Sequence, residues 1–555
     1  MTDGADSGAK ALRHFPGHVP RGGRLWLVAL LLTLPAVAPY ASHYLCRGDR
    51  VPTGFIQGDQ PNYMAVAREY FDSDAVHFLY GNPLTGDYAT PRIYFQPSTF
   101  LLGLAREISG LDPGIIFVAF GFLAALVLAR LVIALYSDVE GMASTAQRAG
   151  LLIFFWGGGV FVIAGLTITG YFTLYGGSFS WRALFQLDPF VGWWMLNLGR
   201  NIVMPLESYY HLLFLGSVLL AIRQHYRGAL AAAFVLSLSH PYTGTQLLAV
   251  LFAWGFAEVL IGKRSRVPGW FFATVCVLLV LHITYYLVYL PSFPEHRELM
   301  AEWDQPWFLR AETIAAAYLF VGCAALWRLR SRTRLLAFVG MERNRLLLAW
   351  FVVSFLLANH QWFIHPIEPL HFTRGYVWTS LFLIGAPTFT GLLHRLGARG
   401  NLISRIAVGS VVLVVLSDNI VWLTGHTTHG LPGDVWLTTG QKDIVTWMDS
   451  QRVSGALVVS EDPEVSRMAA VYTSARPWAA VKGITPGEAE REAEQAEFFL
   501  KGRGVPAWEG RPLFIVFSAA RHSPQEISDL VAAGMQGREV VAEHANGDLV
   551  ARLLR

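Results

Sequence analysis

A series of apolar runs, each long enough to cross a lipid bilayer, constrains this 555-residue chain more than any other feature. A bilayer core about 30 Å thick requires roughly 20 helical residues. We predict about eleven spanning helices, near Arg24–Leu45, Gly114–Tyr136, Gly150–Tyr171, Met204–Ile222, Gly228–His240, Thr243–Ile261, Gly269–Leu290, Ala311–Trp327, Leu346–Asn359, Tyr376–Leu393 and Ile403–Leu423. The predicted fold class is therefore an α-helical polytopic membrane protein.

Composition indicates that a water-soluble part accompanies this membrane body. The chain is 53% hydrophobic and 15% charged, which is too apolar for an ordinary soluble protein and too polar for membrane throughout. The net charge of +3 is small, and the basic residues form short clusters between apolar runs rather than one stripe. Composition therefore argues against a nucleic-acid partner.

The distribution of Lys and Arg predicts the orientation in the membrane. If the N-terminal tail (1–23) is cytoplasmic, every inner loop is basic, whereas the outer loop 291–310 carries Glu295, Glu298, Glu302 and Asp304. We interpret the first apolar run as a retained anchor helix rather than a cleaved signal peptide. The transmembrane domain then spans 24–424 and includes a large first outer loop, 46–112.

Residues 425–555 are predicted to form a small α/β domain, placed outside by the odd number of crossings. Short buried strands are expected at Ala456–Ser460 and Leu513–Phe517, with an exposed-face helix at Gly487–Leu500. Val540–Glu543 and Leu549–Leu553 flank Asn546-Gly547, which predicts a hairpin. The domain has no Gly-rich phosphate loop, serine nucleophile elbow or Cys/His metal spacing, so its expected role is to cap a membrane site or bind carbohydrate.

Two apolar segments depart from the spanning pattern. Gly228–His240 is short and ends at His240-Pro241, where the helical hydrogen-bond ladder cannot continue. Broken backbone at membrane depth is tolerated only against protein or a wet cavity, so we expect His240 near a cavity and assign it to substrate binding. Ser98–Ile108 carries Arg106 and Glu107, and we expect it to lie on the outer surface.

Asp59 lies just beyond the first span, in the outer loop and within Gly58-Asp59-Gln60-Pro61-Asn62-Tyr63. This layout resembles the GT-C superfamily of glycosyltransferases, in which a first-loop acid serves lipid-linked sugar chemistry. The resemblance implies an inverting glycosyltransferase with Asp59 as general base and with Asn62 and Tyr63 at the substrate. The alternative is that Asp59 caps a loop helix, as Asp before Pro often does.

The sequence departs from several GT-C families because Gln60, not a second acid, follows Asp59. The absence of a second acid speaks against a mechanism with paired carboxylates and against a metal site. Other acids of the same loop that could take this part are Asp72, Asp74 and Asp87. Arg92 precedes the surface helix, where GT-C proteins carry a Tyr- and Pro-rich approach, and is a further substrate-binding candidate.

The outer segment His360–Tyr376 is the densest group of titratable and aromatic residues at a membrane boundary. Arg374, with His371 and His365 nearby, is suited to hold a phosphate, because a guanidinium supplies paired donors. Glu368 and His365 are candidates for substrate binding. The alternatives are a metal site, although the spacings match no common zinc or calcium motif, and an interfacial aromatic belt.

Arg200 closes an aromatic outer segment, Tyr171–Val203, that either stacks on sugar and prenyl groups or forms an interfacial belt. A cation beside a span on the acidic-leaning face runs against the charge rule, and such breaches often mark function. Arg200 is therefore the third candidate for donor-phosphate binding.

The leading hypothesis is a bacterial inner-membrane glycosyltransferase that uses a polyprenyl-phosphate sugar donor and an extracytoplasmic glycan, lipid or protein acceptor. No cofactor is expected, and the requirement for a divalent metal is left open. The alternatives are a transporter or flippase of a lipid-linked intermediate, which inverted repeats would favour, and a non-catalytic envelope assembly factor.

Overall fold

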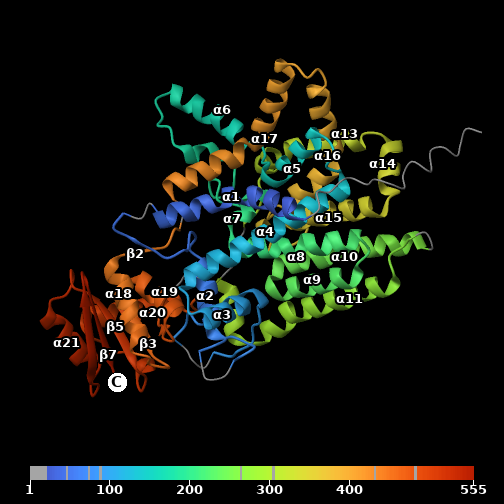
Figure 1. Cartoon of the computed structure of the whole chain (residues 1–555). Helices are drawn as coiled ribbons and strands as arrows, with labels where there is room; N and C mark the ends of the chain where they lie inside the picture. The colour runs from blue at the N-terminus through green and yellow to red at the C-terminus, as the bar shows by residue number, and fades with distance from the viewer. Residues whose placement is uncertain are drawn as a thin grey trace, which may run out of the picture.

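The computed structural model describes residues 22–45, 48–72, 76–86, 90–262, 265–302, 307–430, 433–480 and 484–555. Asp74, Asp87 and Asp304, and the tail up to residue 21, lie outside the described residues. The elements fall into a large helical body and a smaller part that contains a sheet (Figure 1).

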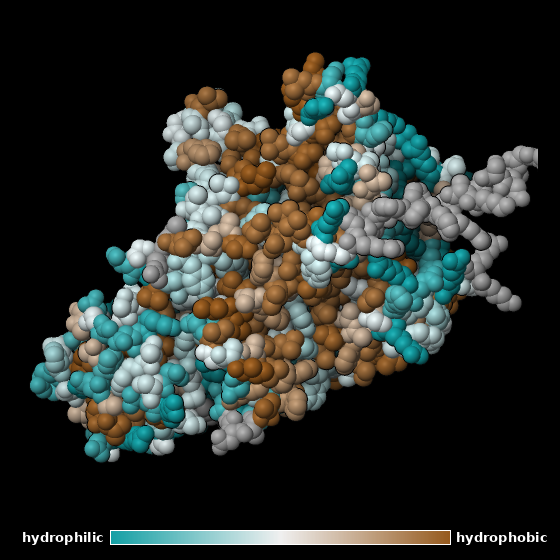
Figure 2. Space-filling model, viewed as in Figure 1, coloured by the Kyte–Doolittle hydropathy of each residue, from teal (hydrophilic) through white to brown (hydrophobic). Residues whose placement is uncertain are grey.

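Within the described residues, eight helical segments are long and apolar enough to cross a membrane, and a bent pair raises the number to nine. They are α1 (Gly23–Leu45), α4 (Pro113–Val139), α8 (Pro205–Ile222), α10 (Pro241–Ile261), Gly269–Ser292 with α11 (Gly269–Thr284), α13 (Ala311–Leu329), Pro369–Gly397 with α16 (Tyr376–Gly397), and α17 (Leu402–His429). Figure 2 shows hydrophobic residues over this body and mostly hydrophilic residues over the C-terminal part. The prediction of a multi-pass helical membrane protein is confirmed.

Two predicted spans form helices that are shorter than the others. The helix α9 (Tyr226–Ser239) has 14 residues, which rise about 21 Å. The helix α15 (Glu342–Ala358) has 17 residues and three charged residues in its first turn. A helix forms at each of the predicted positions. The number of spans is nevertheless below the predicted value of about eleven, because α9 and α15 are short and α15 begins with charged residues.

The predicted span Gly150–Tyr171 is instead a broken helix. The helices α5 (Thr145–Trp156) and α6 (Phe161–Leu174) meet at 64° across Gly157-Gly158-Gly159. A Cβ at Gly159 would lie 2.1 Å from the carbonyl oxygen of Ala316, so α13 leaves room only for glycine. Asp418 on α17 accepts hydrogen bonds from the backbone N–H groups of Phe161 and Val162 at 3.2 and 2.9 Å and so satisfies the start of α6.

Shorter elements connect these helices and form the outer loop. They are β1 (Val51–Pro52), α2 (Gln60–Glu69), α3 (Pro97–Ser109), α7 (Leu198–Val203), α12 (Pro294–Glu302) and α14 (Arg332–Val339), with 3₁₀ turns at Trp181–Phe185, Leu290–Ser292, His360–Trp362 and Pro369–Phe372 and a π turn at Tyr285–Tyr289. A further 3₁₀ turn, Pro506–Trp508, lies in the C-terminal part. The helix α3 forms where a surface helix was predicted, and it is too short to be a membrane span.

The C-terminal part is an α/β unit, as predicted. Its sheet has the order β4-β3-β5-β7-β6, with β4, β3 and β5 parallel and β7 antiparallel to both neighbours. The strands are β2 (Trp436–Leu437), β3 (Leu457–Ser460), β4 (Arg476–Pro477), β5 (Leu513–Ser518), β6 (Val540–Asn546) and β7 (Leu549–Leu554), and the helices are α18 (Thr439–Ser450), α19 (Pro463–Tyr472), α20 (Glu488–Lys501) and α21 (Pro524–Gly534). The predicted hairpin at Asn546-Gly547 is confirmed.

The C-terminal unit packs on the first outer loop. The strand β2 pairs with β1, outside the main sheet. Arg68 donates to the carbonyl oxygen of Ala470 at 2.8 Å, and Arg106 donates to those of Val471 and Tyr472 at 2.9 and 3.1 Å. The loop and the C-terminal unit therefore lie on the same side of the helical body (Figure 1).

A buried ion pair between Glu69 on α2 and Arg476 on β4 crosses this contact. The two side chains are 1% and 6% exposed, and Arg92 adds a longer contact to Glu69 at 3.8 Å. Removal of one member of a buried pair leaves a charge in a low-dielectric environment, which is strongly destabilising.

We expect Arg476→Ala to destabilise the contact by about 3 kcal/mol. The thermal midpoint of the purified protein should fall, and proteolysis of the C-terminal unit should accelerate. Arg503→Ala is the matched control, because Arg503 and its partner Glu497 are 68% and 46% exposed and such pairs contribute little. Equal behaviour of the two variants would show that the Glu69–Arg476 pair does not hold the unit in place.

Candidate active site

A cavity of about 450 Å³ lies between the outer loop, the start of α8 and the turn before α16. It brings together six residues that the sequence analysis selected from three separate segments. They are Asp59, Asn62, Tyr63, His240, His371 and Arg374. The predicted general base and two of the predicted phosphate-binding residues thus share one cavity.

Asp59 directly precedes α2 but does not cap it through its side chain. Its carboxylate instead accepts a hydrogen bond from Gln57 at 2.9 Å and is exposed to the cavity. The surrounding protein partly removes water from this carboxyl, and this desolvation raises its pKa. The positive charge of Arg467, the hydrogen bond from Gln57 and the charge of Arg374 oppose the rise. The net shift is upward, which makes Asp59 a stronger base than an ordinary aspartate.

Tyr63 and Asn62, on α2, provide polar groups beside Asp59. Burial and the nearby Asp59 raise the pKa of the Tyr63 hydroxyl to about 12, so this group stays protonated. Neither amide atom of Asn62 has a hydrogen-bond partner among the described residues, although the side chain is buried. A buried amide without a partner is costly and is suited to a ligand.

His371, Glu368 and Arg374 form a connected polar group next to the cavity. The Arg374 guanidinium donates to Nδ1 of His371 at 2.6 Å, so this nitrogen is the acceptor. Nε2 of His371 lies 3.1 Å from the Glu368 carboxylate. The His371 ring also stacks between Tyr242 and Trp307, with centroids 4.7 and 5.7 Å away. These contacts fix the orientation of the ring.

The backbone of the turn before α16 has a positive φ angle at three positions, two of them in residues other than glycine. Glu368, Arg374 and Gly375 have positive φ angles of 43°, 24° and 75°. Non-glycine residues rarely adopt such angles, and they concentrate at functional sites. A hydrogen bond of 2.8 Å joins Nε2 of His211 to the carbonyl oxygen of Arg374 and holds the turn against α8.

Glu207, in the first turn of α8, is a cavity residue that the sequence analysis missed. Its carboxylate forms an ion pair with Arg374, and both side chains are 8% exposed. Glu207 is thus a second carboxylate in the cavity, besides Asp59. An ionisable residue inside a predicted span is itself a signal of function and could have identified Glu207.

Arg467, on α19 of the C-terminal unit, is the second missed residue. One of its guanidinium nitrogens lies 3.4 Å from the Cβ position of Gly58, next to Asp59. Arg467 has the largest electrostatic effect on Asp59 and pairs with Glu464 at 3.5 Å. Sequence alone could not show that the C-terminal unit approaches the first loop so closely.

Three predicted site residues lie elsewhere. Arg200 is fully buried in an ion pair with Asp188 and donates to Asn419 at 3.1 Å, so the prediction that it holds the donor phosphate is corrected. Arg92 is partly exposed and faces Glu69 rather than the cavity. His365 is exposed and does not line the cavity. Glu368 does not line it either, but its carboxylate contacts His371, which does.

A second, mainly apolar cavity of about 640 Å³ adjoins the first. Asn62, Leu299, Met300 and Ile484 line both cavities. The walls of the second cavity come from the outer loop, α10, the π turn and the segment after α15. Among the described residues, no cluster of three or more His, Cys, Asp or Glu side chains could hold a metal ion.

If Arg200 only stabilises the fold through its ion pair with Asp188, removal of Asp188 should compensate for the stability lost when Arg200 is replaced. We expect Arg200→Met to lower stability by about 3–5 kcal/mol, because Asp188 would be left buried without its ion-pair partner. The double variant Arg200→Met/Asp188→Leu should recover much of the thermal midpoint. A double variant no more stable than Arg200→Met would contradict this assignment.

No protein-family model matches the sequence, and no curated protein matches it. Among solved structures, the crystal structure of the Archaeoglobus fulgidus oligosaccharyltransferase in complex with Zn and sulfate aligns with 92% of this chain and 70% of its own, at 11% identity and a TM-score of 0.49. The archaeal oligosaccharyltransferase AglB from Archaeoglobus fulgidus, in complex with an inhibitory peptide and a dolichol-phosphate, aligns with 92% of this chain and 71% of its own, at 12% identity and a TM-score of 0.43. ArnT from Cupriavidus metallidurans in the apo state aligns with 95% and 97%, at 12% identity and a TM-score of 0.46.

Proposed function

We propose that this protein is an inverting membrane glycosyltransferase of the GT-C type. It transfers a sugar from a polyprenyl-phosphate donor to an extracytoplasmic glycan, lipid or protein at a bacterial inner membrane. One observation carries the proposal, namely that the cavity holding Asp59, Arg374 and His371 adjoins a larger apolar cavity. A polyprenyl-phosphate sugar has the same two parts, a polar head and a long apolar chain.

The apolar cavity supports the assignment of the donor lipid. Tyr285, Tyr286 and Leu287 of the π turn line it, and this turn continues the spanning helix α11. A prenyl chain that entered here from the bilayer would bring its phosphate towards the shared wall at Asn62. The unpartnered amide of Asn62 is suited to bind the phosphate or the sugar at that point.

The polar cavity supports a single displacement at the sugar. In the proposed step, the Asp59 carboxylate accepts the proton of the acceptor hydroxyl while the oxygen of that hydroxyl bonds to the anomeric carbon. The bond from that carbon to the phosphate oxygen breaks, and the electron pair leaves with the polyprenyl phosphate. Arg374 stabilises the developing negative charge. Glu207 and His371 act as positioning residues for Arg374.

Asp59→Asn tests the proposed base directly. We expect transfer from a panel of polyprenyl-phosphate sugars to fall about 10²–10⁴-fold, because the amide cannot accept the proton. Asp49→Asn changes an exposed acid of the same loop and is the control, with wild-type activity expected. Undiminished transfer by Asp59→Asn would remove this residue from the mechanism, whereas no transfer from any donor by wild type would count against the glycosyltransferase itself.

Arg467→Gln tests the electrostatic environment of Asp59. The Arg467 charge opposes the upward shift in the Asp59 pKa, so its removal should raise this pKa further. The base must be ionised, and the acid limb of the pH–rate profile should therefore move to higher pH, by about 0.5–1 unit. Arg503→Gln, on the exposed face of the same unit, should leave the profile unchanged. An unmoved limb in Arg467→Gln would argue against coupling between Arg467 and the base.

A further inference from the structure

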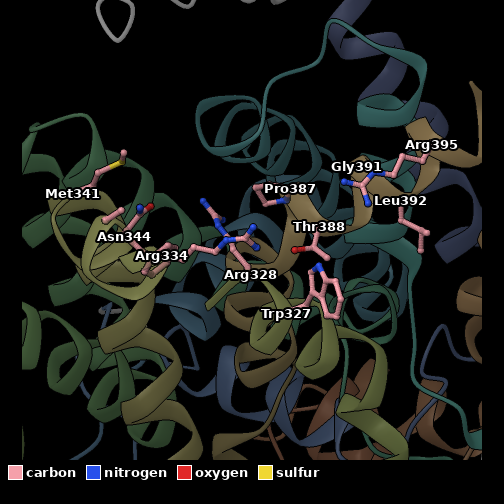
Figure 3. A pocket seen from close by; sticks show the side chains of 12 residues that line it. Trp327, Arg328, Arg334, Met341, Asn344, Pro387, Thr388, Gly391, Leu392 and Arg395 are labelled. Carbon is pink, nitrogen blue, oxygen red and sulfur yellow. The ribbon is translucent and has the colours of Figure 1, made fainter. Parts of the chain in front are cut away.

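A third cavity, of about 650 Å³, lies at the far ends of two helices that begin at the candidate active site (Figure 3). Trp307, shortly before α13, and Arg374, shortly before α16, line the Asp59 cavity. Arg328 near the end of α13 and Arg395 near the end of α16 line the far cavity. The 19 residues of α13 rise about 28 Å, close to the thickness of a bilayer core. The far cavity thus lies at the opposite membrane surface.

The far cavity is cationic. Arg328, Arg334 and Arg395 line it, from α13, α14 and α16, and none of the lining residues is acidic. Arg328 donates to the carbonyl oxygen of Ile384 at 2.7 Å, and its guanidinium lies over the Phe338 ring at 4.9 Å, which fixes its position. Arg334 and Arg395 form no ion pair within the described part of the chain.

One carboxylate lies close to this group but is already engaged. Glu140 accepts a hydrogen bond from the Thr390 hydroxyl and interacts electrostatically with both Arg328 and Arg343. It therefore offsets only part of the charge of the three lining arginines. A guanidinium group binds phosphate oxygens with paired donors, so the cavity is suited to a phosphate group.

The walls of the far cavity are apolar and continue onto the lipid-facing surface. Trp327, Phe338, Met341, Pro387 and Leu392 line it. Trp327, Met341 and Leu392 are 57%, 45% and 45% exposed, at the ends of helices that belong to the membrane body. A free inorganic phosphate would leave these apolar walls uncovered, whereas an amphiphile with an anionic head would contact both parts of the cavity.

We infer that the far cavity binds the head of an anionic phospholipid from the membrane leaflet opposite the candidate active site. The phosphodiester lies between the guanidinium groups of Arg328, Arg334 and Arg395, and an acyl chain follows Trp327 and Leu392. Basic pockets between transmembrane helices on the cytoplasmic side are suited to such heads, and the excess of arginine predicts that this end is cytoplasmic. This site is separate from the proposed glycosyl transfer.

Native mass spectrometry of the full-length protein in mild detergent tests this inference. Dioleoyl phosphatidylglycerol and dioleoyl phosphatidylcholine are titrated separately, and wild type should retain phosphatidylglycerol at least tenfold more strongly. Arg334→Gln/Arg395→Gln should lose most of this preference, and both side chains are exposed, so folding should be preserved. Arg332→Gln/Arg399→Gln removes two exposed arginines that do not line the cavity and should behave as wild type.

Gly391→Phe provides a second variant that leaves the charge unchanged. Gly391 lines the cavity and has open space at its Cβ position, so the new ring would fill the site from α16. We expect the same loss of phosphatidylglycerol as in the double variant. Unchanged retention in both variants would overturn the inference. Displacement of the lipid by millimolar inorganic phosphate or glycerol 3-phosphate would also overturn it and would indicate a site for a soluble phosphate.

Discussion

The arrangement of the candidate site depends on the ion pair between Arg374 and Glu207. It joins the turn before α16 to the first turn of α8, two segments that are distant in sequence and meet at the cavity. Because both charges are buried, either one alone would be strongly unfavourable, and the two segments are held together. The positive φ at Arg374 and the bond from His211 to its carbonyl oxygen are further constraints on the same turn.

The charges around the cavity alternate in sign. Arg467 and Arg374 both act on Asp59, and Arg374 in turn contacts Glu207 and His371. An anionic group that enters the cavity must therefore share Arg374 with Glu207 rather than find a free cation. In the proposed transfer, such sharing would suit a group whose negative charge increases during the reaction, since the guanidinium would respond more strongly to a leaving phosphate than to a bound donor.

Local patterns predicted much of the fold and part of the site. Hydrophobic length located the helices, and short apolar runs and the Asn546-Gly547 turn located the strands. The position after the first span selected Asp59, and the dense polar segment at a membrane boundary selected His371 and Arg374, which line the same cavity as Asp59. Of the two missed residues, Arg467 depends on a long-range contact, because it acts only where α19 reaches the first loop. Arg200 illustrates the reverse limit, since a charge that breaks the topology rule marks a buried structural pair as readily as a ligand site.

The pairing between the first outer loop and the C-terminal unit has a consequence for biogenesis. Thr53 donates to the carbonyl oxygen of Val435, 382 positions later in the chain, and β1 has its strand partner only in β2 within the described residues. During synthesis, the loop that carries Asp59 emerges early, but its partners follow only after the whole helical body has been inserted. The part of the cavity wall that Ile484 supplies is therefore completed last, after the helices have been inserted.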